Sequence, residues 1–161
     1  MLNMTNYPYL PEGRQIFYVP ITDKFMALAK ETAMKESTDF GQPTGSVVAK
    51  DGQILGKAAN RAPLGHIKLL NEWHKRGWCI RRLLKIKTGT KYWACPGCAK
   101  YSDHSEQRAI KDAIKNGKNP IDADLYLWGH WWCCKPCWDK IIGANIKNVY
   151  LLDTSEKEFK R

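Results

Sequence analysis

The feature that most constrains this chain is a pair of short motifs, His104-x-Glu106 and Cys134-x-x-Cys137. One histidine and two cysteines can hold a zinc ion while a fourth position stays open for water, which is the arrangement of catalytic zinc sites. Glu106 lies two residues after the histidine, too near to be an incidental acid. We therefore take His104, Cys134 and Cys137 as candidate zinc ligands and Glu106 as the candidate catalytic acid and base.

Both motifs are expected to open helices. The apolar residues after the first motif recur at helical spacing, and Gly117 is expected to cap that helix. A second apolar helix is expected from Trp138 to Ala144, with Cys134 and Cys137 bracketing one turn at its start. Two helix N-termini directed at one point would stabilise a thiolate and a hydroxide there, because that end of a helix is positive.

These two motifs, in this order, resemble those of the zinc-dependent cytidine and deoxycytidylate deaminase superfamily, whose signature is H-x-E followed by P-C-x-x-C. The sequence departs from this signature at one position, because Cys133 stands where the family has proline. Cys134 keeps the C-x-x-C spacing, so we expect Cys133 to be packed behind the ligands. The alternative is a structural zinc knuckle with an unrelated glutamate.

The resemblance implies a three-layer α/β/α fold of the cytidine-deaminase type, with a mixed central sheet and the zinc site at two helix N-termini. It implies hydrolytic deamination, in which Glu106 takes a proton from water and delivers protons to the ring nitrogen and to the leaving ammonia. By the same resemblance, the backbone around Ser105 orients the base and Asn60 contacts the sugar. For Asn60 the alternative is a turn residue with a structural role.

The remaining sequence fits the order of elements in that fold. A helix is expected from Thr22 to about Thr38, followed by a hairpin with strands at 45–49 and 54–58 around an Asp-Gly turn. Strands are also expected at 121–127 and 146–152, with Asn145 at positive φ before the second. Prolines predict an extended arm over residues 1–20, and the charged tail over 153–161 leaves a fifth strand in doubt.

Residues 61–103, called the insertion below, are strongly basic. They contain ten Lys and Arg residues against two acids, so they carry +8 of the chain's net charge of +10. Two short amphipathic helices are expected, broken at Gly77. Aromatic residues among the cations could stack on bases or pack on the domain, and these readings stay open for Trp78, Tyr92 and Trp93. A second aromatic cluster, expected to wall a base pocket in part, comprises Trp128, His130, Trp131 and Trp132.

The insertion also contains a second C-x-x-C pair, Cys95 and Cys98. A closed structural zinc site needs two more ligands. Cys79 is one candidate, and His66 or His74 is the other. The resemblance permits a second zinc here, because some deoxycytidylate deaminases carry a structural zinc in this part of the fold. The alternative is a pair of buried thiols.

Size and composition set broader limits. A chain of 161 residues fits one deaminase domain over residues 1–161. Neither an apolar run of membrane-spanning length nor a signal peptide is visible, so we expect a soluble, cytoplasmic protein without a membrane partner. In that setting the six cysteines fit metal ligands better than disulfides. The positive charge implies an anionic partner, either a nucleotide phosphate or nucleic acid.

Three functions compete. The first is conversion of deoxycytidylate (dCMP) to deoxyuridylate (dUMP), because Asn60, Pro63 and Gly65 resemble the N-x-x-P-x-G of deoxycytidylate deaminases. The second is deamination of a base in RNA or single-stranded DNA, or of another free nucleoside or nucleotide. The third is a non-catalytic zinc module, which would have no need of an acid beside its ligands. We expect a small-molecule nucleotide substrate, a homo-oligomer, and a phosphate contact from one or two of Arg61, Lys68, Arg81 and Arg82.

Overall fold

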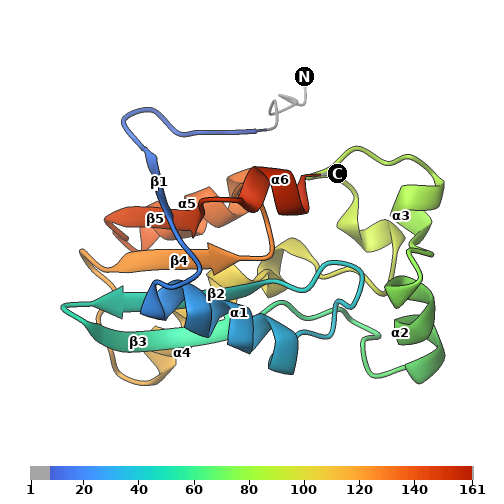
Figure 1. Ribbon diagram of the computed structural model, residues 1–161, viewed down its shortest axis with the longest axis horizontal. Coiled ribbons are helices and arrows are strands. Elements are labelled where there is room, and N and C mark those ends of the chain that lie inside the picture. Colours follow the sequence, from blue (N-terminus) through green and yellow to red (C-terminus); the bar gives the residue numbers. More distant parts are fainter. Residues whose placement is uncertain (1–7, 161) are drawn as a thin grey trace.

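A five-stranded mixed sheet forms the centre of the molecule, as the computed structural model shows for residues 8–160 (Figure 1). The strand order is β1-β5-β4-β2-β3. β1, β5 and β4 are parallel to one another, whereas β2 is antiparallel to both β4 and β3. The strands are β1 (Ile16–Val19), β2 (Gly45–Lys50), β3 (Gln53–Ala59), β4 (Asp124–Trp128) and β5 (Asn148–Leu152).

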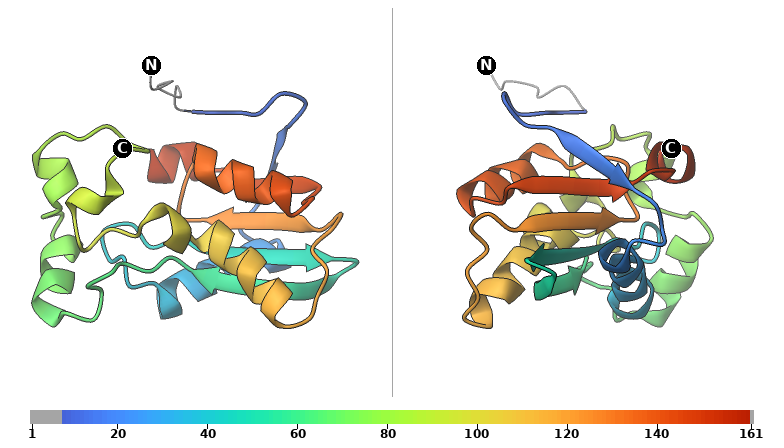
Figure 2. Two further views of the ribbon diagram at one scale, coloured as in Figure 1. Left: turned by 180° about the vertical axis from the view of Figure 1, so that it is seen from behind. Right: turned by 60° about the vertical axis from the view of Figure 1, so that its left-hand side comes forward.

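Helices cover both faces of this sheet, which gives the three layers expected from the sequence. α1 (Lys24–Glu36) lies on one face, and α4 (Ser105–Lys115) and α5 (Lys135–Gly143) run side by side across the other (Figures 1 and 2). α2 (Lys68–Lys75) and α3 (Ile80–Leu83) stand beyond one end of the sheet, and α6 (Ser155–Phe159) lies near the C-terminus. Among the described residues, no helix has the length and apolar character that crossing a membrane requires.

Each face of the sheet has its own apolar core. On the face of α4 and α5, the buried cluster includes Ile110, Leu125 and Trp138. On the face of α1, a smaller cluster is built around Met26 and Val47. Alternate residues of the strands supply both cores because successive strand side chains point to opposite faces.

The extended arm expected over residues 1–20 is in part a strand of the sheet. Ile16 to Val19 form β1, which pairs in parallel with β5, and residues 1–7 lie outside the described part of the chain. The fifth strand, expected after β5 if present, therefore comes from the N-terminal side of the chain. The segment gives little sequence signal because an edge strand with exposed Phe17 and Tyr18 has no apolar alternation.

Several element boundaries also differ from expectation. Asp23, not Thr22, caps α1: its carboxylate accepts hydrogen bonds from the backbone of Phe25 and Met26. α5 begins at Lys135, so the second motif lies in its first turn as expected. The tail over residues 153–161, expected only to be charged, contains the short helix α6. Gly77, Gly117 and Asn145 do adopt positive φ, as their turn and cap positions predict.

Gly56 on β3 permits α4 to lie directly against the sheet. A Cβ atom at this position would stand 2.4 Å from the backbone nitrogen of Ala113 and 2.5 Å from the carbonyl oxygen of Ala109. These are backbone atoms of α4, so they cannot rotate away. The height of α4 above the sheet, and hence the position of its N-terminus, depends on this glycine.

We expect Gly56→Ala to destabilise the protein by about 1–3 kcal/mol, the usual cost of overpacking a close contact. The measurement is urea unfolding of the purified variant. The matched control is Gly143→Ala in the last residue of α5, where an added Cβ meets nothing within 4 Å. Its stability should stay within about 1 kcal/mol of wild type. Equal midpoints for the two variants would contradict this account of the α4 contact.

Candidate functional site

Two helix N-termini meet at the end of the sheet where β4 stops. His104 is the residue that precedes α4, and Cys134 is the residue that precedes α5. Both have extended backbone conformations, and neither side chain caps its own helix in the described structure. Their side chains are therefore free to face one another rather than the helix backbone.

These side chains form a three-residue cluster with zinc-like geometry. The Nδ1 atom of His104 lies 3.5 Å from the Sγ atom of Cys134 and 3.5 Å from that of Cys137. A tetrahedral zinc ion with Zn–S of about 2.3 Å and Zn–N of about 2.0 Å separates such ligand atoms by roughly 3.5 Å. The candidate ligands named from the sequence are thus brought together at the spacing a zinc ion requires, with a fourth position left open.

The electrostatic setting favours a thiolate in this cluster. The pKa of Cys134 is lowered to about 5, chiefly by its hydrogen bond with Cys137 and also by His104. A thiol with such a pKa is largely ionised near neutral pH, and the thiolate is the form that binds metal. Burial and the hydrogen bond to Cys134 raise the pKa of Cys137 well above its usual value, so binding of a divalent cation would release the proton of this second thiol.

Glu106 lies in the first turn of α4 and is only 5% exposed. The hydroxyl of Ser105 donates a hydrogen bond of 3.3 Å to its Oε2 atom. Burial raises the pKa of Glu106, and the negative charge of Cys134 raises it further while His104 opposes the shift. A carboxyl group with a raised pKa can both accept and return a proton near neutral pH.

Cys133 is packed, as the sequence predicts. It is fully buried within the core on the α4 and α5 face. Burial raises the pKa of its thiol well above the usual value, so it stays neutral. It does not belong to the cluster of His104, Cys134 and Cys137.

Ser105 has a fully buried side chain that joins α4 to the sheet. Its hydroxyl shares a hydrogen bond of 2.8 Å with the hydroxyl of Ser46 on β2. The Ser105 side chain is thus occupied by contacts within the protein. This arrangement leaves the backbone of the residue, the part expected to orient a base, as its means of contact with a ligand.

Asn60 follows β3 and is held by three hydrogen bonds. Its Oδ1 atom accepts from the Ser37 hydroxyl at 2.6 Å and from the Thr44 backbone at 3.0 Å, and its Nδ2 donates to the Gln42 carbonyl at 3.0 Å. Asn60 borders the cavity described next, but both acceptor positions of its oxygen are in use. Only one N–H of the amide remains for a ligand, so the structural alternative accounts for most of this side chain.

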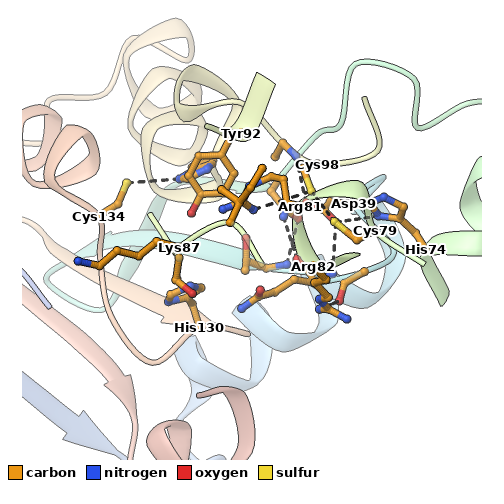
Figure 3. A pocket seen from close by; sticks show the side chains of 18 of the residues that line it. Asp39, His74, Cys79, Arg81, Arg82, Lys87, Tyr92, Cys98, His130 and Cys134 are labelled. Atoms are coloured by element: carbon orange, nitrogen blue, oxygen red, sulfur yellow. Dashed lines mark hydrogen bonds and ion pairs between the residues drawn. The ribbon is translucent and has the colours of Figure 1, made fainter. Parts of the chain in front are cut away.

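A cavity of about 490 Å³ opens beside the cluster (Figure 3). This volume falls in the range of pockets for small ligands. His104, Glu106 and Cys134 belong to its lining. Gln42 and Thr44 line the cavity from the loop before β2, and no spacing or motif in the sequence points to them.

Cations of the insertion form another part of the lining. They are Arg81, Arg82, Lys85 and Lys87, whereas Arg61 and Lys68 lie outside it. The guanidinium of Arg81 lies over the Tyr92 ring, 4.0 Å from its centroid, and the Tyr92 ring meets that of His104 edge-on at 4.8 Å. Arg81 is therefore linked to His104, a candidate zinc ligand, through the Tyr92 ring.

Only some of the aromatic residues named from the sequence line this cavity. Tyr92, His130 and Trp132 line the cavity. Trp78 and Trp93 are 63% and 75% exposed and lie outside it. Trp128 instead packs edge-on against Phe159 of α6, and Trp131 lines a neighbouring cavity. Burial lowers the pKa of His130 to about 4, so this ring is a neutral part of the wall.

Solved structures similar to this chain are deaminases. The dCMP deaminase of cyanophage S-TIM5 is 19% identical, with 79% of this chain and 78% of that one covered and a TM-score of 0.49. The guanine deaminase of Bacillus subtilis is 21% identical, with 86% and 70% covered and a TM-score of 0.46.

A longer enzyme is also similar, the diaminohydroxyphosphoribosylaminopyrimidine deaminase/5-amino-6-(5-phosphoribosylamino)uracil reductase of Thermotoga maritima. It is 25% identical over 79% of this chain, with a TM-score of 0.43, and the match spans 28% of its length. No curated protein sequence matches the chain.

A family model provides the assignment. The model of the cytidine and deoxycytidylate deaminase zinc-binding region matches residues 20–153, which include both motifs and the whole insertion. With the ligand geometry at the two helix N-termini, this match shows that the chain belongs to the zinc-dependent cytidine and deoxycytidylate deaminase family, a family of hydrolytic deaminases.

Proposed function

We propose that the protein deaminates a free pyrimidine nucleotide, converting dCMP to dUMP with release of ammonia. The observation that carries this proposal is the composition of the cavity wall. His104, Cys134 and Glu106 line the cavity together with cations of α3 and of the segment after it. Such a wall offers groups for both the reacting base and a phosphate.

In this proposal His104, Cys134 and Cys137 hold zinc, and Glu106 is the proton carrier. When bound, zinc supplies a water whose pKa is lowered toward neutrality. Glu106 accepts a proton from that water as the water oxygen adds to the ring carbon that bears the amino group. The same carboxyl passes this proton to the ring nitrogen. It then takes the second proton from the added hydroxyl group and gives it to the departing amino nitrogen, so water is consumed and ammonia is released.

The arginines of α3 are the proposed phosphate ligands. Arg81 and Arg82 border the cavity, and charge-assisted hydrogen bonds from arginine to phosphate are short and often bidentate. The guanidinium of Arg81 is held against Tyr92, and Arg82 donates to the Gly41 carbonyl at 3.0 Å. Both side chains are thus positioned before a ligand binds, which lowers the entropic cost of binding.

A second candidate function is deamination within a nucleic acid strand. One observation favours it: a neighbouring cavity of about 470 Å³ shares Lys87, Thr88 and Trp132 with the first and adds Trp131. An aromatic and basic surface of this kind can stack and hold an adjoining nucleotide. The two functions differ in how many phosphates must be neutralised.

We expect Glu106→Ala to retain the zinc held at His104 and to lose most turnover. The carboxyl is not needed as a ligand, whereas proton transfer by one group is typically worth about 10²–10⁴-fold in rate. The measurements are zinc content and ammonia release by the purified variant. Near-native turnover would rule out Glu106 as the proton carrier.

Substitution of the α3 arginines separates a nucleotide substrate from a polymer. We expect either Arg81→Ala or Arg82→Ala to lower kcat/KM for dCMP at least about tenfold, since one charged hydrogen bond is worth roughly 1.5–3 kcal/mol. The same variant should deaminate deoxycytidine as wild type does, because the nucleoside has no phosphate. Arg61→Ala, which removes an arginine outside the cavity lining, is the matched control and should leave both rates unchanged.

The result for a polymer substrate would differ in form. Each of the three arginine changes would weaken activity on a single-stranded oligonucleotide slightly, and each lost phosphate contact would lower the salt slope by about one. Rapid deamination of an oligonucleotide together with an inert dCMP would overturn the nucleotide proposal. The neighbouring cavity would then be part of the strand-binding surface.

A further inference from the structure

A single tryptophan ring stands between the two cavities described above, the one beside the cluster at the helix N-termini and its neighbour. Three residues line both cavities, namely Lys87, Thr88 and Trp132. Lys87 and Thr88 are exposed side chains of the insertion, whereas Trp132 is partly buried and is the only one of the three that carries a ring. Its indole is therefore the main barrier between a cavity of about 490 Å³ and one of about 470 Å³.

Trp132 also lies close to the groups proposed to carry out the reaction. It comes two residues before Cys134, and both residues pack in the core cluster on the α4 and α5 face. It lines the same cavity as His104 and Glu106. In the proposed function the ring carbon that bears the amino group must reach these groups, so the rest of the substrate must lie in the space that Trp132 helps to bound.

The backbone of the segment that carries Trp132 is fixed by its neighbours. Gly129 follows β4 at positive φ, and a Cβ atom there would stand 2.2 Å from the carbonyl oxygen of Pro43. The segment thus lies directly against the loop before β2. The Nδ1 atom of His130 then accepts a hydrogen bond of 3.1 Å from the backbone N–H of Trp132. These contacts set the position of Trp132 before a ligand binds.

The N-terminal arm fixes the ring of Trp132. Its indole N–H donates a hydrogen bond of 2.6 Å to the carbonyl oxygen of Tyr9. The arm follows α5 to reach this point. The Arg14 guanidinium lies over the Trp138 ring, 5.7 Å from its centroid, and the Tyr9 ring lies 5.6 Å from the ammonium of Lys135. A packed tryptophan whose N–H has a partner is held in one orientation, so the arm takes part in the barrier.

The two residues that the insertion contributes to the barrier lie in a fixed turn. The Thr90 hydroxyl donates a hydrogen bond of 2.7 Å to the Lys87 carbonyl, which closes the turn. The Tyr101 hydroxyl donates one of 2.6 Å to the Gly89 carbonyl, which joins the turn to the segment before α4. Lys87 and Thr88 are therefore held in place from the same side of the chain as the candidate zinc ligand that precedes α4.

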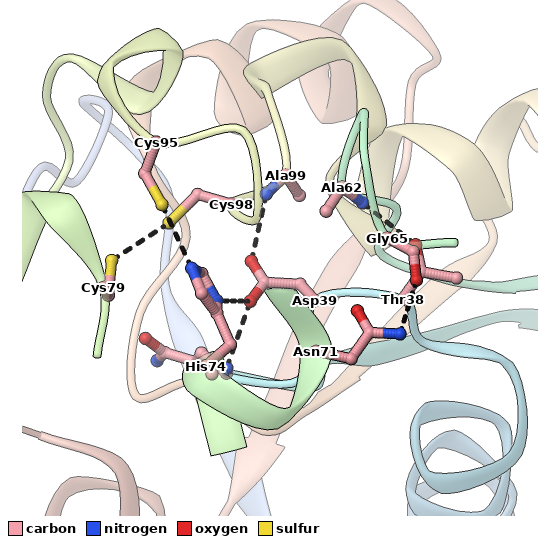
Figure 4. A network of polar contacts seen from close by, with 12 residues as sticks. Thr38, Asp39, Ala62, Gly65, Asn71, His74, Cys79, Cys95, Cys98 and Ala99 are labelled. Atoms are coloured by element: carbon pink, nitrogen blue, oxygen red, sulfur yellow. Dashed lines mark hydrogen bonds and ion pairs between the residues drawn. The ribbon is translucent and has the colours of Figure 1, made fainter. Parts of the chain in front are cut away.

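The rest of the insertion is joined to the domain by a polar network (Figure 4). The Asp39 carboxylate accepts hydrogen bonds from the backbone of Gln42 at 3.2 Å and of Ala99 at 3.0 Å, and it lies 3.8 Å from the His74 ring. His74 belongs to the group of ligand-type residues expected from the sequence, whereas His66 is exposed and outside it. The atoms of this group lie within 4.8 Å of one another, and its members are His74, Cys79, Cys95 and Cys98. The cavity wall that the insertion supplies is thus tied to the domain.

We propose that Trp132, held by the arm, limits the length of the substrate and makes the site selective for pyrimidine over purine nucleotides. In a purine nucleotide the second ring lies between the sugar and the ring that bears the amino group. Such a nucleotide needs a longer cavity between the reacting groups and its phosphate, and the indole closes the volume into which it would extend. This inference rests on the proposed function, because that function places the amino-bearing ring beside His104 and Glu106.

The test is equilibrium binding of dCMP and dAMP, which differ only in the base. It is measured by calorimetry on zinc-loaded protein that carries Glu106→Ala, so that neither nucleotide is consumed. With Trp132 intact, dCMP should bind at least about tenfold more tightly than dAMP, and adding Trp132→Ala should lower this preference at least about tenfold. An added methylene alone can be rejected by about 10–200-fold in a closed pocket.

The matched control is Trp93→Ala, which removes an indole that is 75% exposed and outside both cavities. It should leave the preference for dCMP unchanged. Equal binding of the two nucleotides with Trp132 intact, or an unchanged preference in the Trp132→Ala protein, would overturn the proposed barrier.

The part played by the arm is tested with Trp132→Phe, which keeps a ring in the core and removes only the donor to Tyr9. The preference for dCMP should fall about threefold or more, the scale of one neutral hydrogen bond, and less than in Trp132→Ala. This variant also tests the barrier if the alanine variant does not fold. A preference equal to that of the parent protein would disprove the role of the arm.

Ammonia release from dCMP by wild type tests the proposed function separately. An inactive wild type together with a lowered preference in Trp132→Ala would count against dCMP deamination and support the barrier. Turnover of dCMP together with an unchanged preference would support the proposed function and count against the barrier.

Discussion

The convergence of two helix N-termini on one point is the constraint on which the rest of the structure depends. α5 begins at the end of the sheet where β4 stops because it connects β4 to the parallel β5. α4 begins at the same end because it follows β3, which runs in the same direction as β4. The hydrogen bond between Ser46 and Ser105 fixes the start of α4 to β2, and Gly56 sets its height above β3. With both helices fixed, His104 and Cys134 face each other, and the positive ends of the helices stabilise negative charge between them.

That negative charge explains why a bound metal ion would stabilise the folded protein as well as supply chemistry. Two cysteines and the buried Glu106 share a small region with a single histidine. Without a cation, ionising more than one of these acids is opposed by burial and by repulsion, which is why the pKa of Glu106 is raised. A bound dication is the largest charge in such a site and reverses this balance. Zinc binding and the ionisation of its ligands are therefore coupled.

The sequence predicted the parts of the site that depend on local spacing. Residues within one turn of a helix start must lie together, so the proximity of His104 to Glu106, and of Cys134 to Cys137, could be predicted from spacing alone. The cavity wall could not, because Gln42 and Arg81 reach it from distant segments with no shared spacing. β1 was missed for a related reason: its partner β5 is more than a hundred residues away, and its exposed edge lacks a periodic pattern. The fixed hydrogen bonds of Asn60 likewise depend on tertiary contacts that a turn-like sequence does not reveal.

The candidate zinc site and the proposed phosphate ligands thus stand on different parts of the molecule. Glu106 and the three candidate ligands stand on helices packed against a large apolar core, where small displacements are costly. The arginines that face the same cavity stand on the insertion, whose apolar cluster consists of three cysteines with Tyr92 packed against them. In the proposed function, a change at these arginines would therefore affect binding of the phosphate more than the groups that move protons. Family membership consequently fixes the reaction more firmly than the substrate, because the arginines proposed to bind the phosphate lie on the part of the chain least constrained by the sheet.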